Sequence, residues 1–133
     1  MTKKRLTVFL SYAADDKAVA RDLIGKLESR GIDTWFDEHE IQPGAKWDEQ
    51  IRNAITHSDY LVAILPKEKP SQYVLFEIGL ALGEKKTVIP VSIGEQIERS
   101  VLPPISMFRT IRSEDTATAA DEIALQIAAA SDA

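Results

Sequence analysis

The sequence predicts an α/β fold in which helices cover both faces of a parallel sheet. Short apolar runs typical of strands alternate along the chain with stretches whose apolar residues have helical spacing. Two of the runs, residues 59–65 and 86–93, are apolar enough to be buried on both faces, as inner strands of parallel sheets are. Because parallel strands need crossover connections, we expect a flavodoxin-like three-layer sandwich with a five-stranded parallel sheet in the order 2-1-3-4-5.

The first half of the chain supplies two strands and two helices. A β-branched and apolar run over residues 5–12 predicts the first strand, and the small and acidic residues after it suit a helix start. The helix over residues 15–30 has apolar residues at helical spacing and stops at Gly31. Residues 32–36 predict the second strand, and a loop then leads to a helix from Trp47.

The second half of the chain continues the alternation. Residues 59–65 predict the central third strand, and residues 72–83 predict a helix because of their length and their leucine and alanine content. Residues 86–93 predict the fourth strand. Weaker signals predict, in chain order, a turn or short helix near Ile97, a fifth strand over residues 107–111 and an amphipathic helix over residues 116–129.

Composition excludes several classes of protein. The 133 residues suit one domain, residues 1–133, of average globular composition. The net charge of −5 and the scattered basic residues argue against binding to nucleic acid. The absence of cysteine excludes disulfides, iron–sulfur clusters and cysteine nucleophiles, and suits a reducing cytoplasm. Because no apolar run approaches the length of a membrane span, we expect no membrane partner.

The predicted topology indicates where a ligand binds. In such sheets, ligands bind outside the carboxyl ends of the strands, where the strand order reverses. That rule gathers Ser11, Tyr12, the loop after Phe36 and the loop over residues 66–71 around one crevice, and Glu77 in the following helix faces it.

Glu77 is the one carboxylate in the apolar stretch 72–83. Its helical neighbours three and four residues away include no basic residue; they are Tyr73, Val74, Leu80 and Ala81. An unpaired, half-buried carboxylate is a candidate for a functional site. The alternative interpretation is that the head of the side chain simply reaches water.

Several kinds of site are excluded by missing motifs. A receiver domain needs an aspartate at the end of the third strand, and this strand ends in Ala63, Ile64 and Leu65. The sequence SYAADD after the first strand lacks the glycines that bind a dinucleotide, so a nucleotide is expected as a substrate and no cofactor is expected. His39 and His57 lack metal-ligand spacing, so we expect surface or capping roles for them and no metal site.

The order of segments resembles the TIR (Toll/interleukin receptor/resistance) domain family over essentially the whole chain, and looks most like its bacterial members. The segments that carry the resemblance are VFLSYAADD, GIDTWFDEHEIQPG, IRNAITHSDYLVAIL and SQYVLFEIGLALGEKKTVIPV. Some members of that family are adaptors that signal by self-association, whereas others cleave NAD between nicotinamide and ribose.

The enzymes of that family carry a catalytic glutamate four residues after an aromatic residue, in the pattern W-C-x-x-E. Glu77 resembles that glutamate. Tyr73 replaces the tryptophan and Val74 replaces the cysteine, yet tyrosine still offers a flat face for a nicotinamide or adenine ring. The resemblance therefore favours an enzyme over a degenerate adaptor.

The resemblance also implies roles for other residues. Those expected to bind substrate are Ser11, Tyr12, Asp37, Ser71 and Tyr73. Those expected in an assembly loop, which closes the site or contacts a neighbouring subunit, are Glu38, Glu40, Pro43, Gly44 and Trp47. Trp35 is expected in the core because it lies in a strand.

The function implied is that of an NAD glycohydrolase that acts in bacterial defence or virulence signalling and is activated by self-association. Its partners are NAD and further copies of the chain. The product is ADP-ribose or a cyclic isomer, and the sequence does not choose between them. The first alternative is a non-catalytic module that acts only by association. A weaker one is an enzyme that transfers nucleoside or nucleotide glycosyl groups, against which the loop FDEHEIQPG argues.

Overall fold

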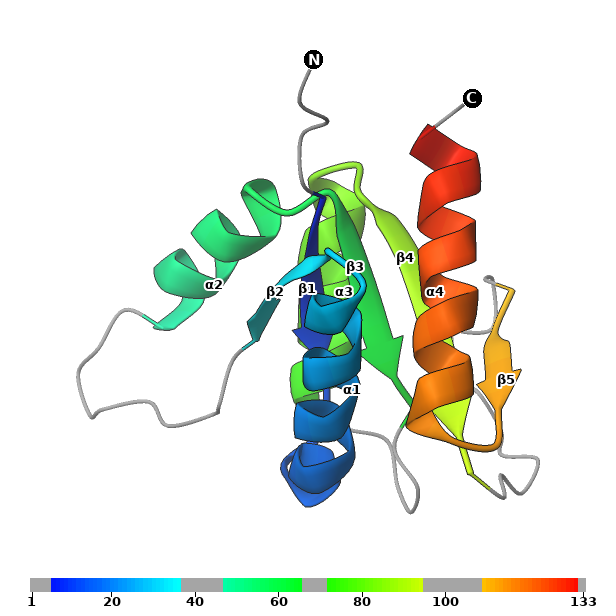
Figure 1. Ribbon diagram of the computed structural model, residues 1–133. Coiled ribbons are helices and arrows are strands. Elements are labelled where there is room, and N and C mark those ends of the chain that lie inside the picture. Colours follow the sequence, from blue (N-terminus) through cyan, green and yellow to red (C-terminus); the bar gives the residue numbers. More distant parts are fainter. Residues whose placement is uncertain (1–5, 37–46, 66–71, 95–108, 132–133) are drawn as a thin grey trace.

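The computed structural model describes residues 6–36, 47–65, 72–94 and 109–131 (Figure 1). The strands within these residues are β1 (Thr7–Ser11), β2 (Asp33–Phe36), β3 (Tyr60–Ile64), β4 (Thr87–Ile93) and β5 (Ile111–Ser113). The helices are the 3₁₀ turn η1 (Ala14–Asp16), α1 (Lys17–Ser29), α2 (Trp47–Thr56), α3 (Gln72–Gly83) and α4 (Thr116–Ser131).

The strands form one parallel sheet in the order β2-β1-β3-β4-β5, which confirms the predicted topology. β3 is central, as its continuous apolar sequence predicts. The carboxyl ends of the strands lie together at the lower edge of the sheet in Figure 1.

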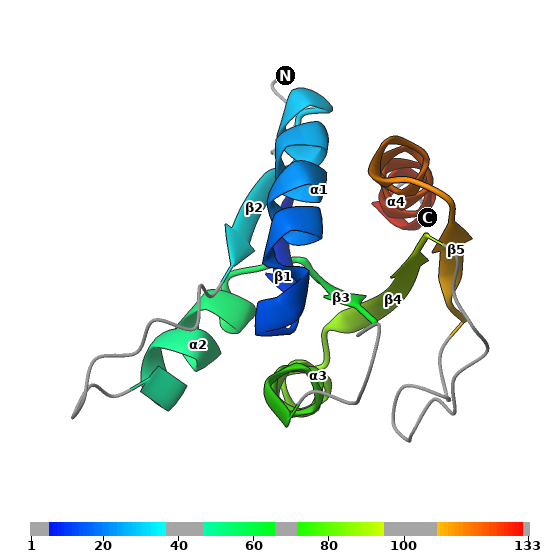
Figure 2. The ribbon, with the colours of Figure 1, turned by 90° about the horizontal axis from the view of Figure 1, so that it is seen from below.

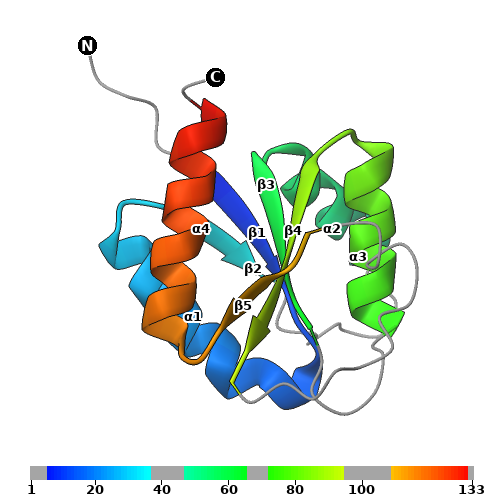
Figure 3. The same ribbon diagram turned by 90° about the vertical axis from the view of Figure 1, so that its right-hand side faces the viewer.

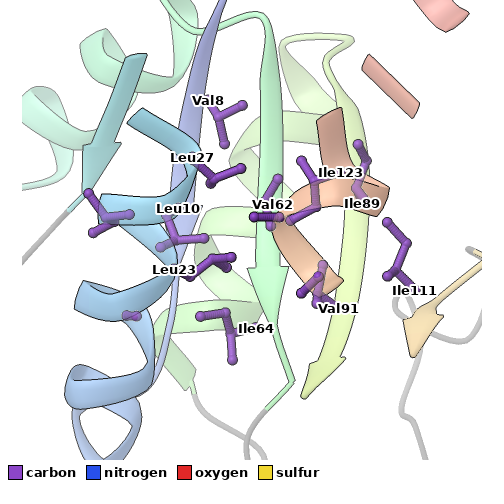
Figure 4. Close-up of a cluster of buried hydrophobic side chains, with 14 of the residues drawn as sticks. Val8, Leu10, Leu23, Leu27, Val62, Ile64, Ile89, Val91, Ile111 and Ile123 are labelled. Carbon is purple, nitrogen blue, oxygen red and sulfur yellow. The ribbon is translucent and has the colours of Figure 1, made fainter. Parts of the chain in front are cut away.

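Helices cover both faces of the sheet, so the predicted three-layer arrangement is also confirmed. Figures 2 and 3 show α1 and α4 on one face and α2 and α3 on the other. Alternate residues of each strand point to opposite faces, and this alternation divides the buried side chains into two clusters. The larger cluster, against α1 and α4, includes Val8 and Leu10 of β1 (Figure 4).

The smaller cluster lies against α2 and α3 and positions the candidate site. Its buried members are Phe9, Ile51, Ile55, Leu61, Ala63, Val74, Ile78, Ala81 and Val88. Phe9 and Leu61 come from strands whose next residues face the other cluster. Because both clusters draw side chains from β1 and β3, residues 8–10 and 61–64 of these strands are all apolar.

Helix ends follow the local sequence. α1 ends at Ser29, and Gly31 has a φ of +82°, a conformation that favours glycine. The amide of Gly31 donates to the carbonyl of Glu28, and the amide of Ile32 donates to that of Leu27. The predicted stop at Gly31 is therefore confirmed.

Two predictions about the strands are corrected. β5 begins at Ile111, not at residue 107; Arg109 and Thr110 are outside any strand, and residues 107 and 108 lie outside the described residues. Trp35 is 38% exposed and is not a core residue, because β2 is an edge strand; its ring stacks on Phe9 with centroids 5.2 Å apart. The turn expected near Ile97 also lies outside the described residues.

None of the helices in the described part of the chain combines the length and the apolar content that crossing a bilayer requires.

Candidate active site

Glu77 lies on the face of α3 that packs against the sheet. Val74, Ile78 and Ala81 are buried on this same face at helical spacing. The Glu77 side chain has 0% exposure, so the interpretation that its head reaches water is wrong. A carboxylate in this position replaces what packing alone would make an apolar residue.

Ser11 supplies a hydrogen bond to this carboxylate. Ser11 is the last residue of β1, it is 1% exposed, and its Oγ donates to Glu77 Oε1 at 2.6 Å. The two residues are 66 positions apart in the sequence. The expectation of an unpaired carboxylate was wrong, because only the partners within the helix were considered.

The strand residues beside Ser11 are small or lack a long side chain. In the sheet register, Ser11 pairs with Ala63 of β3, and Ala63 pairs with Pro90 of β4. Ser11 and Ala63 lie at or next to the carboxyl ends of β1 and β3, whereas Pro90 lies in the middle of β4, and the row is on the face covered by α3. Since a helix rises 1.5 Å per residue, Glu77 lies about 7.5 Å along α3 from its first residue, Gln72.

A second carboxylate is buried near the end of β1. Asp16 in η1 is 4% exposed, whereas its neighbour Asp15 is exposed. The acidic residues after the first strand were expected at a helix start, and both lie in η1 directly before α1, but only Asp15 is exposed. Nothing in the local sequence separates the two residues, so the burial of Asp16 could only be found from the structure.

The other predicted site residues are not all brought to Glu77. Tyr12 is 1% exposed and packs in the larger cluster, which lies on the α1 and α4 face. Trp47 begins α2 and Tyr73 lies in the first turn of α3, but the structure does not describe their side chains. The predicted residues that lie wholly outside the described residues are Asp37, Glu38, Glu40, Pro43, Gly44 and Ser71. Their roles stay predictions.

The sequence predicts surface or capping roles for His39 and His57 and no metal site. His57 is exposed and its Nδ1 lies 2.7 Å from the carbonyl oxygen of Asn53 at the end of α2, which confirms a surface, capping position. His39 is outside the described residues. Within the four described ranges, no group of three or more histidine, aspartate or glutamate side chains is placed to hold a metal ion.

Comparison with known proteins gives one family. The sequence pattern of the family described as "TIR domain" matches residues 8–125. A protein of Brachypodium distachyon described as "Probable 2' cyclic ADP-D-ribose synthase BdTIR" is 30% identical over 92 residues, which are 67% of this chain and 41% of that protein. "NAD(+) hydrolase TcpA" of a Theionarchaea archaeon is 30% identical over 90 residues, which are 63% of this chain and 27% of that protein. The chain thus spans less than half the length of these relatives.

Solved structures give the same fold. The metazoan TIR-STING receptor from C. gigas, in complex with 2',3'-cGAMP, is 27% identical with a TM-score of 0.69, over 87% of this chain and 37% of that one. A diflavin flavoprotein from Nostoc is 17% identical with a TM-score of 0.53, over 86% of this chain and 82% of that one, and shows the flavodoxin-like fold alone.

Proposed function

The chain belongs to the TIR domain family, and from that premise we propose that it cleaves NAD between nicotinamide and ribose. Fold and family alone do not decide this, because the function resides in a site. The observation that carries the proposal is a carboxylate, Glu77, buried on an apolar helix face and hydrogen-bonded by Ser11. The activity of two relatives, as their names describe it, supports the same chemistry.

The reaction needs little acid catalysis from the protein. The bond between the ribose C1′ and the nicotinamide nitrogen breaks, and its electron pair leaves with the nicotinamide, which is then neutral. Positive charge builds on the ribosyl ring, as in the oxocarbenium-like transition states of glycosidases. Attack by water then gives ADP-ribose and a proton, whereas attack by the adenine or a ribose hydroxyl of the same molecule gives a cyclic isomer.

Glu77 is suited to the demand that this reaction makes. An ionised carboxylate stabilises the charge that develops on the ribosyl ring and accepts hydrogen bonds from the ribose hydroxyls. The buried residues around it are apolar, and a low local polarity strengthens the electrostatic attraction. A pocket of this kind favours the transition state over the ground state because the charge appears only as the bond breaks.

The burial of Glu77 supports regulation by a conformational change, and we propose that self-association drives this change. With 0% exposure, the carboxylate meets substrate only after the groups that cover it move. We therefore expect a single chain to turn over NAD slowly and an assembled chain to turn it over faster. We propose defence or virulence signalling as the role of such an activity, because the sequence looks most like bacterial members of the family.

A second candidate function is a module that acts by association alone. α3 is apolar on nearly all sides, and its Phe76 and Leu82 remain 41% and 37% exposed. A partner protein could cover such side chains, and singly exposed apolar residues are also normal on a monomer. The two functions differ in one observable, because only the enzyme consumes NAD.

The test is the release of nicotinamide from NAD by concentrated protein, with and without a crowding agent. The proposal expects nicotinamide and a second product in equal amounts, which mass spectrometry identifies as ADP-ribose or a cyclic isomer. Assembled protein that leaves NAD intact would instead support the association module.

A further inference from the structure

The hydrogen bond between Ser11 and Glu77 joins two buried side chains from different elements. Its length of 2.6 Å lies in the range of O–H···O bonds to an ionised carboxylate. Both residues are essentially removed from water, with 1% and 0% exposure. Because bulk water does not compete for the carboxylate, the geometry of this bond is set by the fold.

The described residues that share the smaller cluster with α3 are apolar, and the other described buried carboxylate, Asp16, lies in η1 after β1. α2, β1, β3 and β4 pack against α3. The buried residues that these four elements place in the cluster with Glu77 are Ile51, Ile55, Phe9, Leu61, Ala63 and Val88. The described charged side chains of α2, Glu49 and Arg52, are exposed, and Tyr60 of β3 packs against the other cluster.

We propose that Ser11 is a positioning residue for Glu77, and that it acts on the reaction through this carboxylate and not as a contact to substrate. A glutamate side chain has three rotatable bonds, and the Ser11 hydroxyl holds Oε1 against the end of β1. A hydrogen bond donated to a carboxylate also favours its ionised form. The inference rests on the proposed function, since Glu77 must take part in catalysis for its position to matter.

The kinetic test uses two variants whose new side chains, threonine and valine, have the same shape. Ser11→Thr keeps the hydroxyl, whereas Ser11→Val replaces it with a methyl group of similar size. We expect Ser11→Val and Ser11→Ala to lower kcat by about ten- to a hundred-fold, because small displacements of a catalytic group are costly, with a smaller change in KM. Ser11→Thr should recover most of the rate.

The pH profile gives a readout that a purely structural role would not move. Loss of a hydrogen bond to the charged form raises the pKa of a carboxyl, so the pH below which activity is lost should rise. The expected rise in Ser11→Val is about one to two pH units. Ser58→Ala is the matched control, because Ser58 is also buried but donates to the Ala54 carbonyl. Native kcat and a native acid limb in Ser11→Val would overturn the inference.

A direct titration keeps the inference independent of turnover. The ¹³C resonance of the Glu77 carboxyl, assigned by its disappearance in Glu77→Gln, is followed with pH in the native chain and in Ser11→Val. We expect its midpoint to rise by about one to two pH units in the variant and to stay in place in Ser58→Ala. An unmoved midpoint overturns the positioning role even if NAD is consumed. Native protein that leaves NAD intact while the midpoint moves overturns the proposed function, and it leaves only the effect of Ser11 on the Glu77 carboxyl standing.

Discussion

A buried carboxylate such as Glu77 is expected to destabilise the fold in which it sits. Removing a charge from water costs several kcal/mol, and the hydrogen bond from Ser11 returns only part of that free energy. The site is otherwise lined by apolar residues that an apolar side chain could join. At the scale of residues, the pair is better explained by activity than by stability.

Replacing both partners tests this explanation. The double variant Ser11→Ala, Glu77→Met leaves neither a buried charge nor a hydroxyl without its acceptor. We expect it to raise the free energy of unfolding by about 1–3 kcal/mol while it abolishes NAD cleavage. Urea denaturation measures the stability change, and a clear loss of stability would show that the pair holds the fold together.

Glu77 could be located from the sequence, but its environment could not. The apolar neighbours within the helix mark Glu77 as unusual, and these neighbours are visible in the sequence. Its donor, Ser11, is 66 residues away and is brought there by the pairing of β1 beside β3 under α3. Helical spacing describes only contacts within one element, so it could not reveal this bond or the full burial.

At the scale of elements, the approach of α3 to the sheet depends on a small residue in β3. Ala63 is fully buried in the cluster beneath α3 and pairs with Ser11 in the sheet. A larger side chain there has no space unless α3 moves outward. Because Glu77 is carried by α3, the same movement would stretch its bond to Ser11.

A matched pair of overpacking variants separates this effect from simple destabilisation. Ala63→Leu and Ala120→Leu each enlarge a fully buried alanine, but Ala120 lies on α4 in the other cluster. We expect each to lower the free energy of unfolding by about 1–3 kcal/mol. Only Ala63→Leu should reduce NAD cleavage by folded protein, as measured by nicotinamide release well below the melting temperature. Equal activity of the two would contradict the account.

The contact between α1 and the start of α4 carries a dependence on pH. Hydrogen bonds from the Lys26 and Thr116 side chains lower the pKa of Asp22. The backbone amide of Thr118 in the first turn of α4 donates to Asp115 at 2.8 Å and lowers the pKa of that carboxyl. A pKa lowered by folding contributes stability that is present above the ordinary value and is lost as pH falls through the lowered one.

Removing these two carboxyls should reduce the loss of stability that occurs as the pH falls. In Asp22→Asn, Asp115→Asn, the melting temperature should fall less than that of the native chain as the pH drops below about 4. Asparagine still caps a helix, so the variant should fold at neutral pH. Asp15→Asn, which changes one exposed charge in η1, serves as the control. If the melting temperatures of the native protein and the double variant fell equally as the pH dropped, the assignment would be contradicted.

Elements with strong patterns were predicted well, and short edge elements were not. The helix over residues 72–83 has the bounds of α3, because an apolar run of that length admits few other interpretations. β5 has three residues and lies at the sheet edge, so its pattern is too short to fix its register. Trp35 lies in a strand as predicted, but the edge position of β2 leaves it partly exposed.

At the scale of the whole molecule, the order of strands followed from physical rules that act on the alternation of elements. Crossovers in parallel sheets have one hand, and central strands are apolar on both faces, which places β3 in the middle. The sequence could not show which surface a second copy of the chain would contact, because a surface patch has no periodic signal. The exposed Phe76 and Leu82 of α3 appear only in the structure.

For the whole molecule, the proposed function predicts that self-association controls the rate of NAD cleavage. We expect nicotinamide release per chain to rise with protein concentration, because mass action favours the assembled state. Phe76→Ser, which removes an exposed apolar side chain, should lower this concentration dependence without unfolding the protein. Light scattering and turnover measured on the same samples check both points. Full specific activity in a dilute, demonstrably monomeric sample would rule out this form of regulation.

The most direct test of the central claim compares nicotinamide release by the native chain and by Glu77→Gln in the assembled state. Glutamine keeps the size of the side chain and its ability to accept a hydrogen bond from Ser11, but it has no charge to stabilise the ribosyl cation. The account predicts steady release by the native chain and a loss of at least about a hundred-fold in the variant, with fold and assembly unchanged. Equal release by the two proteins would contradict it.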